Sequence, residues 1–294
     1  MSVAEPSQDR WAQWLLQRRH GGDPATLAAM VDDLYQFRDT VLGHAVVTAG
    51  EVLLDVGAGD GLIAFGALPL VGEQGTVIFS DISQDLLDRC QALADEVGAS
   101  DRCRFLRASA DNLSAVGDAA VNVVTTRSVL IYVPAKRQAV QEFYRVLAPG
   151  GRLSIFEPIN RFASPEPPHL FCGYDVMPIR DSAAKVRAVY DRLQPGETDP
   201  MLDFDERDLI AFVEQAGFGE IHMDLHIEVR PVRPEPWESF LRRSGNPTIP
   251  THDEAMREAL TPAEVERFTA HLRPLVEQGR GTWRMAVAYL WAVK

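Results

Sequence analysis

The chain has 294 residues, of which 46% are hydrophobic and 24% charged, and its formal net charge is −13. This composition is typical of a globular protein. The negative charge argues against nucleic acid or an anionic membrane as a partner, because both need a dense cationic surface. No apolar stretch is long enough to span a bilayer, and the first ten residues lack the apolar core of a signal peptide. We therefore expect a cytoplasmic protein.

The three cysteines, Cys90, Cys103 and Cys172, are widely spaced and form no Cys-x-x-Cys pair. Neither a zinc site nor a disulfide framework is indicated, and we predict no metal.

The N-terminal residues 8–47 predict two helices, separated by the segment 20–24. Trp11, Trp14 and Leu15 share one face of the first helix. Asp23 can cap the second, with Pro24 at its first position.

From residue 51 the pattern alternates between strands and helices. Strands are expected at 51–56, 76–80, 103–107, 121–126 and 152–157. Helices are expected at 60–70, 83–97, 112–117 and 134–147. This alternation implies parallel strands with helices on both faces of the sheet.

The rhythm breaks over residues 158–203, which contain seven prolines and one helical stretch, 181–193. A helix at 205–216 and a strand at 218–229 follow. Two further helices near 234–243 and 261–278 precede a closing strand over 283–294.

These elements predict an α/β fold, a Rossmann-like doubly wound sheet of seven strands that is mostly parallel with an antiparallel last strand. The expected domains are an N-terminal helical cap (1–48), a cofactor-binding core (49–158), a lid insert (159–203), and a C-terminal part of the core (204–294) that carries a helical insert (231–282).

A glycine-rich turn follows the first strand, in the run Val-Leu-Leu-Asp-Val-Gly-Ala-Gly-Asp-Gly over residues 52–61. The buried strand brings Asp55 to its carboxyl end. Gly57, Gly59 and Gly61 then let the backbone turn sharply beneath a ligand. Nucleotide-binding folds use the crevice at this end of the strands.

Two acids follow the next two strands. Asp81 lies about 20 residues beyond the last glycine, where it can accept hydrogen bonds from both ribose hydroxyls. Alternatively, it caps the helix that begins near Ser83. Asp111 follows a turn of small residues and suits an adenine ring, or it is a helix cap.

With the run Arg-Val-Leu-Ala-Pro-Gly-Gly at 145–151, these residues resemble the class I S-adenosylmethionine-dependent methyltransferases, in particular the small-molecule group that includes ubiquinone/menaquinone, sterol and arsenite methyltransferases. The resemblance covers roughly residues 50–158. It implies S-adenosylmethionine as cofactor and methyl transfer to a small organic molecule. The spacing Gly-x-Gly-x-Gly differs from the Gly-x-Gly-x-x-Gly of dinucleotide dehydrogenases.

The resemblance implies that the glycine turn contacts the methionine end of the cofactor, that Asp81 holds the ribose, and that Asp111 and Asn112 hold the adenine. Tyr35 could close over the cofactor carboxylate, or lie on a solvated helix face. The full expected set is Tyr35, Asp55, Gly57, Ala58, Gly59, Gly61, Asp81, Ile82, Ala110, Asp111, Asn112 and Arg127.

Methyl transfer mainly requires that the nucleophile and the methyl group are held in line, and the candidate catalytic residues are few. Arg127, after the fourth strand, is expected to bind an anionic substrate group or to pair with Glu157. Glu157, which ends the fifth strand, could orient a substrate or anchor Arg127. His169 and Tyr174 are candidate base or orienting groups, or structural parts of the lid. The aromatic residues that could line the pocket are Trp11, Trp14, Tyr35, Phe37, Phe162, Phe171 and Tyr174.

Two other functions remain open. An enzyme on the same scaffold could use the cofactor for a non-methyl reaction such as cyclisation or decarboxylation. A non-catalytic partner subunit could retain the fold. The sequence names neither the substrate nor the methylated atom, and it leaves a homodimer open.

Overall fold

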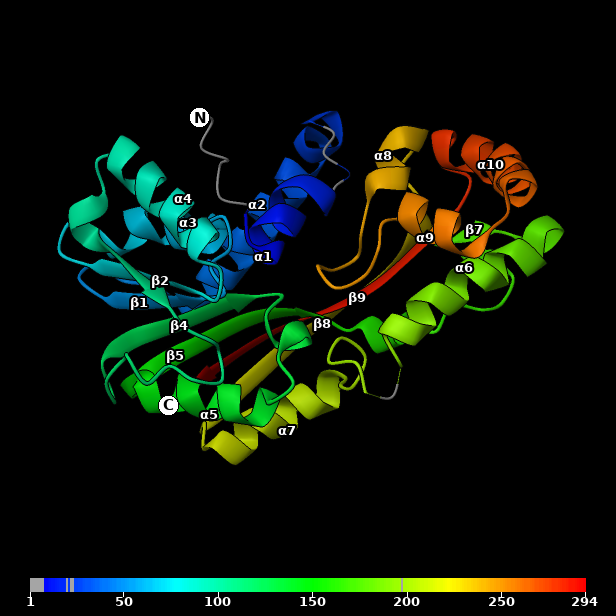
Figure 1. The fold of residues 1–294 in the computed structure, drawn as a ribbon. Coiled ribbons are helices and arrows are strands. Elements are labelled where there is room, and N and C mark those ends of the chain that lie inside the picture. Colours follow the sequence, from blue (N-terminus) through cyan, green and yellow to red (C-terminus); the bar gives the residue numbers. More distant parts are fainter. Residues whose placement is uncertain (1–7, 20, 22–23, 197) are drawn as a thin grey trace.

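Seven strands form one sheet in the order β3-β2-β1-β4-β5-β9-β8 (Figure 1). The strands are β1 (Val52–Val56), β2 (Thr76–Asp81), β3 (Cys103–Arg107), β4 (Val121–Arg127), β5 (Leu147–Pro158), β8 (Glu220–Pro231) and β9 (Thr282–Val293). The first five pair in parallel, and β9 runs antiparallel to both β5 and β8. The predicted Rossmann-like, mostly parallel sheet with an antiparallel last strand is confirmed.

The computed structural model describes residues 8–19, 21, 24–196 and 198–294, so the capping role predicted for Asp23 lies outside the described residues. At the N-terminus, α1 (Arg10–Gln13) continues into a π-helical turn, η1 (Trp14–Arg18). Asp9 caps α1, because its side chain accepts hydrogen bonds from the backbone N–H groups of Trp11 and Ala12. None of the described helices is both long and apolar enough to cross a bilayer.

Helices cover both faces of the sheet (Figure 1). On one face lie α2 (Pro24–Ala45), α3 (Leu62–Val71) and α4 (Gln84–Glu96). On the other lie α5 (Lys136–Val146) and α7 (Glu206–Ala216). Each face has its own hydrophobic core.

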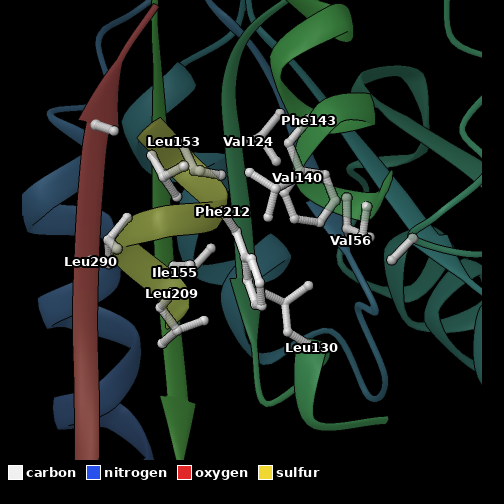
Figure 2. Close-up of a cluster of buried hydrophobic side chains, with 14 of the residues drawn as sticks. Val56, Val124, Leu130, Val140, Phe143, Leu153, Ile155, Leu209, Phe212 and Leu290 are labelled. Atoms are coloured by element: carbon white, nitrogen blue, oxygen red, sulfur yellow. The ribbon is translucent and has the colours of Figure 1, made fainter. Parts of the chain in front are cut away.

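The core beneath α5 and α7 joins residues that are distant in sequence. Figure 2 shows Val124 and Ile155 of the sheet beside Phe143 of α5 and Phe212 of α7. Because the buried positions of α5 recur at three- and four-residue spacing, one face of this helix is apolar and faces the sheet. This packing fixes the strand ends that carry the candidate site.

The two inserts pack together rather than separately. The first contributes a short hairpin, β6 (Leu170–Phe171) with β7 (Tyr174–Asp175), and α6 (Arg180–Leu193). The second contributes α8 (Trp237–Arg242), α9 (His252–Ala259) and α10 (Pro262–Glu277). They share a hydrophobic core of their own. This core lies beside the end of β8 and the start of β9 (Figure 1). We call this the helical unit.

The helix predicted at 112–117 is wrong, because this segment forms turns. Leu113 and Val116 are buried, and the guanidinium of Arg145 donates to both of their carbonyl groups, at 3.0 and 2.9 Å. A partner from α5 therefore fixes the backbone in turns. The short helix α9 and the β6–β7 hairpin were not predicted.

Candidate active site

A cavity lies at the carboxyl ends of β1, β2 and β4, where the predicted glycine turn and acids meet. The residues that line it come from the N-terminal segment, from the turns after these strands and from the turn after β3. They are Trp11, Trp14, Leu15, Arg19, Asp55, Val56, Gly57, Ala58, Gly59, Asp60, Leu62, Ile63, Asp81, Ile82, Leu86, Ala108, Ser109, Ala110, Asp111, Arg127, Ser128, Val129, Tyr132, Val133 and Pro134.

The glycine turn is packed so closely that side chains would not fit. All three glycines have positive φ angles, 67° at Gly57, 58° at Gly59 and 86° at Gly61. A Cβ atom on Gly57 would lie 2.3 Å from a methyl group of Val129, and one on Gly61 would lie 2.5 Å from the ring of Phe65. The turn therefore needs glycine for both conformation and space.

Asp55 is an internal anchor of the site. Its carboxylate accepts a hydrogen bond from the hydroxyl of Thr125 at 2.9 Å and from the backbone N–H of Ala64 at 3.2 Å. It thereby joins β1 to β4 and to the first turn of α3. Burial raises the pKa of Asp55 to about 7, although these hydrogen bonds and the nearby Arg127 act in the opposite direction.

Asp81 ends β2 and is 7% exposed. One carboxylate oxygen accepts from the backbone N–H of Gly59 at 2.9 Å, and the other from that of Ser83 at 2.8 Å. Each oxygen keeps a further acceptor position, since a carboxylate accepts about four hydrogen bonds. Burial raises the pKa of Asp81. The cap of α4 is Ser83, so the alternative role of Asp81 as that cap is wrong.

The predicted adenine segment forms one wall of the cavity. Ala110 is buried and Asp111 lines the space, and the hydroxyl of Ser109 donates to the carboxylate of Asp111. Asn112 is exposed and lies outside the lining, where its side chain accepts from the backbone N–H of Ser114 at 3.3 Å. Asp111 caps no helix, because none follows it.

Arg127 is the cation of the cavity. It is the last residue of β4 and lines the space, and within the described part of the chain its guanidinium has no hydrogen bond or ion pair to a side chain. Burial and the neighbouring Arg19 lower the pKa of Arg127 to about 10, although Asp60 and Asp55 act in the opposite direction. Asp55 and Asp60 act on this guanidinium through charge alone, without an ion pair, so its N–H groups are available to an anionic ligand group in the cavity.

The N-terminal segment forms one wall of the cavity. Trp11 and Trp14 both line it and contact Tyr132 edge to face, with ring centroids 5.1 and 6.0 Å apart. The indole of Trp14 also donates to the backbone carbonyl of Ser244 at 2.9 Å. Residues 9–19, which we call the N-terminal cover, therefore connect the cavity to the helical unit.

Glu157 does not pair with Arg127. It is fully buried, and its carboxylate accepts hydrogen bonds from the backbone N–H groups of Val129 (2.8 Å), Leu130 (2.9 Å) and Ile131 (3.2 Å). It holds the turn after β4. Burial raises the pKa of Glu157 to about 7 despite these three donors. It is absent from the residues that line the cavity, so a catalytic role in contact with a ligand is disfavoured by its position.

Four other predicted site residues also lie outside the cavity, and Gly61 is one of them, because it packs against Phe65. His169 is exposed in the loop before β6. Tyr174 is fully buried in the helical unit, where its ring meets that of Phe240. Tyr35 is 47% exposed beneath the guanidinium of Arg38 and lines a separate hollow between α2 and α3. None of the described residues of the first insert lines the cavity, because this insert packs against the second.

Sequence reasoning missed Arg19 as a site residue. It follows Leu15 by four positions and therefore lies on the face that carries Trp14 and Leu15. That spacing was visible in the sequence. Of the predicted aromatic lining, Phe37 instead packs against Phe156, with ring centroids 4.8 Å apart. Among the described residues, no group of three His, Cys, Asp or Glu side chains is arranged to hold a metal ion.

A doubly wound sheet with a glycine turn after β1 and an acid at the end of β2 defines a protein of the nucleotide-cofactor-binding class. The model of the ubiE/COQ5 methyltransferase family matches residues 31–227, and the chain belongs to this family.

Relatives include the arsenite methyltransferase of Halobacterium salinarum, which is 32% identical over 50% of this chain and 38% of that protein. The ubiquinone/menaquinone biosynthesis C-methyltransferase UbiE of Hahella chejuensis is 34% identical over 44% of this chain and 50% of that protein. The chain thus spans half or less of the length of these curated relatives.

Solved structures share the fold. The YcgJ protein from Bacillus subtilis has a TM-score of 0.53 and 16% identity, over 90% of this chain and 98% of that one. The [4+2]-cyclase SpnF has a TM-score of 0.52 and 20% identity, over 88% of this chain and 80% of that one.

Proposed function

We propose that this protein transfers a methyl group from S-adenosylmethionine to a small organic molecule. The main support is the position of Asp81, which ends β2 and lines the cavity. Each of its carboxylate oxygens accepts one backbone hydrogen bond and can accept another. Two vicinal hydroxyls of a ribose match these acceptors. Family membership supports the same conclusion.

The residues of the cavity fit this cofactor. Gly57 and Gly59 line the cavity and carry no side chain, so the backbone of the turn can lie close to the ligand. Ile82 and Ala110 offer apolar surface to an adenine ring, and Asp111 can accept from its amino group. Arg127 and Arg19 supply positive charge for a carboxylate.

When bound, the cofactor supplies a methyl group on a positively charged sulfur, which is already activated toward a nucleophile. The protein's task is then to hold the nucleophile in line and to exclude water. Trp11, Trp14 and Tyr132 enclose the space from one side. The described lining contains no histidine, and burial raises the pKa of Tyr132 to about 12. The role that we assign to these aromatic residues is therefore positioning rather than proton removal.

We propose that the substrate, or the cofactor's own carboxylate, presents an anionic group to Arg127. The unpaired guanidinium and its neighbour Arg19 support this assignment. The composition supports a cytoplasmic location, without a nucleic-acid or membrane partner.

Calorimetric titration tests the cofactor assignment. S-adenosylmethionine and its demethylated product are expected to bind with micromolar affinity, and NAD is not. Asp81→Asn should weaken binding by about 1.5–3 kcal/mol, the range for hydrogen bonds to a charged acceptor. The matched control is Asp181→Asn, at an exposed position of α6. Unchanged affinity in a folded Asp81→Asn protein would refute the ribose assignment.

Product analysis tests the reaction. A product heavier than its precursor by one CH2 group supports methyl transfer. An isomerised or decarboxylated product formed in the presence of the cofactor would instead support the non-methyl alternative, which the fold also accommodates, since the neighbour SpnF is a cyclase.

A further inference from the structure

β8 is the edge strand of the sheet, with β9 on one side and no strand on the other within the described chain. An open edge presents unpaired backbone N–H and C=O groups that can pair with another strand. The strand is long, Glu220–Pro231. Its outer edge therefore needs either protection or a partner.

The two faces of β8 differ in chemistry. The even-numbered residues are polar and lie on the side of α2, as the contact between Asp224 and His44 at 3.6 Å indicates. The odd-numbered residues are apolar and lie on the side of α7. Only the first of them, Ile221 and Met223, pack against the core that includes α7.

Beyond this point the apolar face is uncovered. Leu225, Ile227 and Val229 are 43%, 51% and 53% exposed. They form a continuous apolar stripe along an open edge, which is where a partner strand would bury them. Such a stripe beside unpaired backbone groups favours a protein partner.

Antiparallel pairing restricts how two copies of β8 can meet. The backbone groups of successive residues point alternately toward and away from a given neighbour, and residues directly opposite each other must point the same way. In a pair of identical strands, even residues therefore oppose even residues and odd oppose odd. Polar and apolar faces then match without further adjustment.

We propose that β8 pairs antiparallel with β8 of a second copy of this chain, with Leu225 on the two-fold axis. Each polar residue then faces an opposite or complementary group. Glu220 faces Arg230, His222 faces Glu228, and Asp224 faces His226. On the other face every pair is apolar.

Neighbouring registers lack this complementarity. If the two-fold axis lies at His226 instead, Asp224 is opposite Glu228 and His226 is opposite its own copy. If the axis lies at Asp224, this residue is opposite its own copy and Glu220 is opposite Glu228. Shifts by four restore complementary pairs but shorten the ladder. Charge complementarity and the length of the ladder together favour this register.

The same symmetry covers the apolar stripe. Around the axis at Leu225, Ile227 lies opposite Met223 of the second copy and Val229 lies opposite Ile221. Since Ile221 and Met223 pack against the core that includes α7, the exposed half of each stripe meets the covered half of the other. The site cavity, formed at β1, β2 and β4, takes no part in this interface.

Light scattering coupled to size exclusion, at micromolar concentration, tests the proposal. The wild-type chain is expected to be a dimer. Leu225→Asp, which places two like charges on the axis, should yield monomers. Asp181→Arg on α6 is the surface control and should remain dimeric. A monomeric wild type, or a Leu225→Asp dimer, would overturn the proposal.

Charge reversal and cross-linking test the register. Glu220→Arg should weaken the dimer at least tenfold, and Glu220→Arg combined with Arg230→Glu should restore it. Leu225→Cys should form a disulfide-linked dimer, since opposed Cα atoms in a ladder lie about 4.5–5.5 Å apart. Ile227→Cys should not, because it lies about 13 Å from its own copy. Efficient cross-linking through Ile227→Cys alone would refute this register.

Discussion

The hydroxyl of Ser83 donates to the side chain of Asp9 at 2.6 Å, which joins the N-terminal cover to the turn that follows Asp81. The backbone N–H of Asp9 also donates to the carboxylate of Asp85 at 2.5 Å. The proposed ribose-binding residue and the cover therefore share one hydrogen-bonded junction, and Asp9 contributes to the raised pKa of Asp81.

Substitution of Asp9 should loosen this junction. Asp9→Ala removes the bond to Ser83 and the cap of α1, whose loss typically costs about 1 kcal/mol. We expect faster hydrogen exchange over residues 10–18 and weaker S-adenosylmethionine binding in calorimetry. Asp88→Ala, at an exposed position of α4, is the control. If Asp9→Ala binds the cofactor as tightly as wild type, the cover does not contribute to the site.

Cofactor binding should protect the N-terminal cover rather than the first insert. Trp11 and Trp14 line the cavity, whereas none of the described residues in 159–203 does. Hydrogen-exchange mass spectrometry is expected to show slower exchange in 9–19 when S-adenosylmethionine is added. Slower exchange confined to 159–203 would instead support the lid function expected from the sequence.

Replacement of Arg127 should separate stability from binding. Its half-buried guanidinium forms no ion pair within the described residues and feels Asp55 and Asp60 only through charge. Arg127→Leu should therefore raise the melting temperature of the ligand-free protein while it weakens the binding of the anionic ligand at least tenfold, about 1.4 kcal/mol. Arg145→Leu is the contrasting variant, because Arg145 donates to Glu142 and Asp118. That variant should melt at a lower temperature. Lower stability of Arg127→Leu would mean that the guanidinium is satisfied within the protein.

Stability should fall as the pH rises toward 8. Burial raises the folded pKa values of Asp55 and Glu157 to about 7, against about 4 in the unfolded chain. Between these values the folded state binds more protons than the unfolded state, so their contribution to the free energy of unfolding decreases as the pH rises through 7. Urea unfolding at pH 5.5 and 8 measures this difference.

Glu157→Gln should reduce that pH dependence and destabilise the protein by about 1–3 kcal/mol, since one backbone donor loses its acceptor. Glu96→Gln, at the exposed end of α4, should change neither quantity. An unaltered slope in Glu157→Gln would show that this carboxyl group does not titrate between pH 5.5 and 8.

The sequence by itself determined the strands of the sheet, the glycine turn and the position of Asp81 after β2. These features depend on local chemistry: apolar runs that prefer buried strands, and glycines that alone adopt the tight turn at Gly57 and Gly61. The tertiary structure decided what each polar group contacts. Glu157 was expected beside Arg127, yet it binds the backbone of residues 129–131.

The cover of the cavity was also a tertiary outcome. The prolines of 158–203 predict a lid, but the buried apolar side chains of this segment pack against those of the second insert. Trp14 instead reaches Ser244, 230 positions away in the chain. Contacts between residues so far apart in the chain depend on the shape complementarity of packed elements. A local sequence pattern therefore does not predict them.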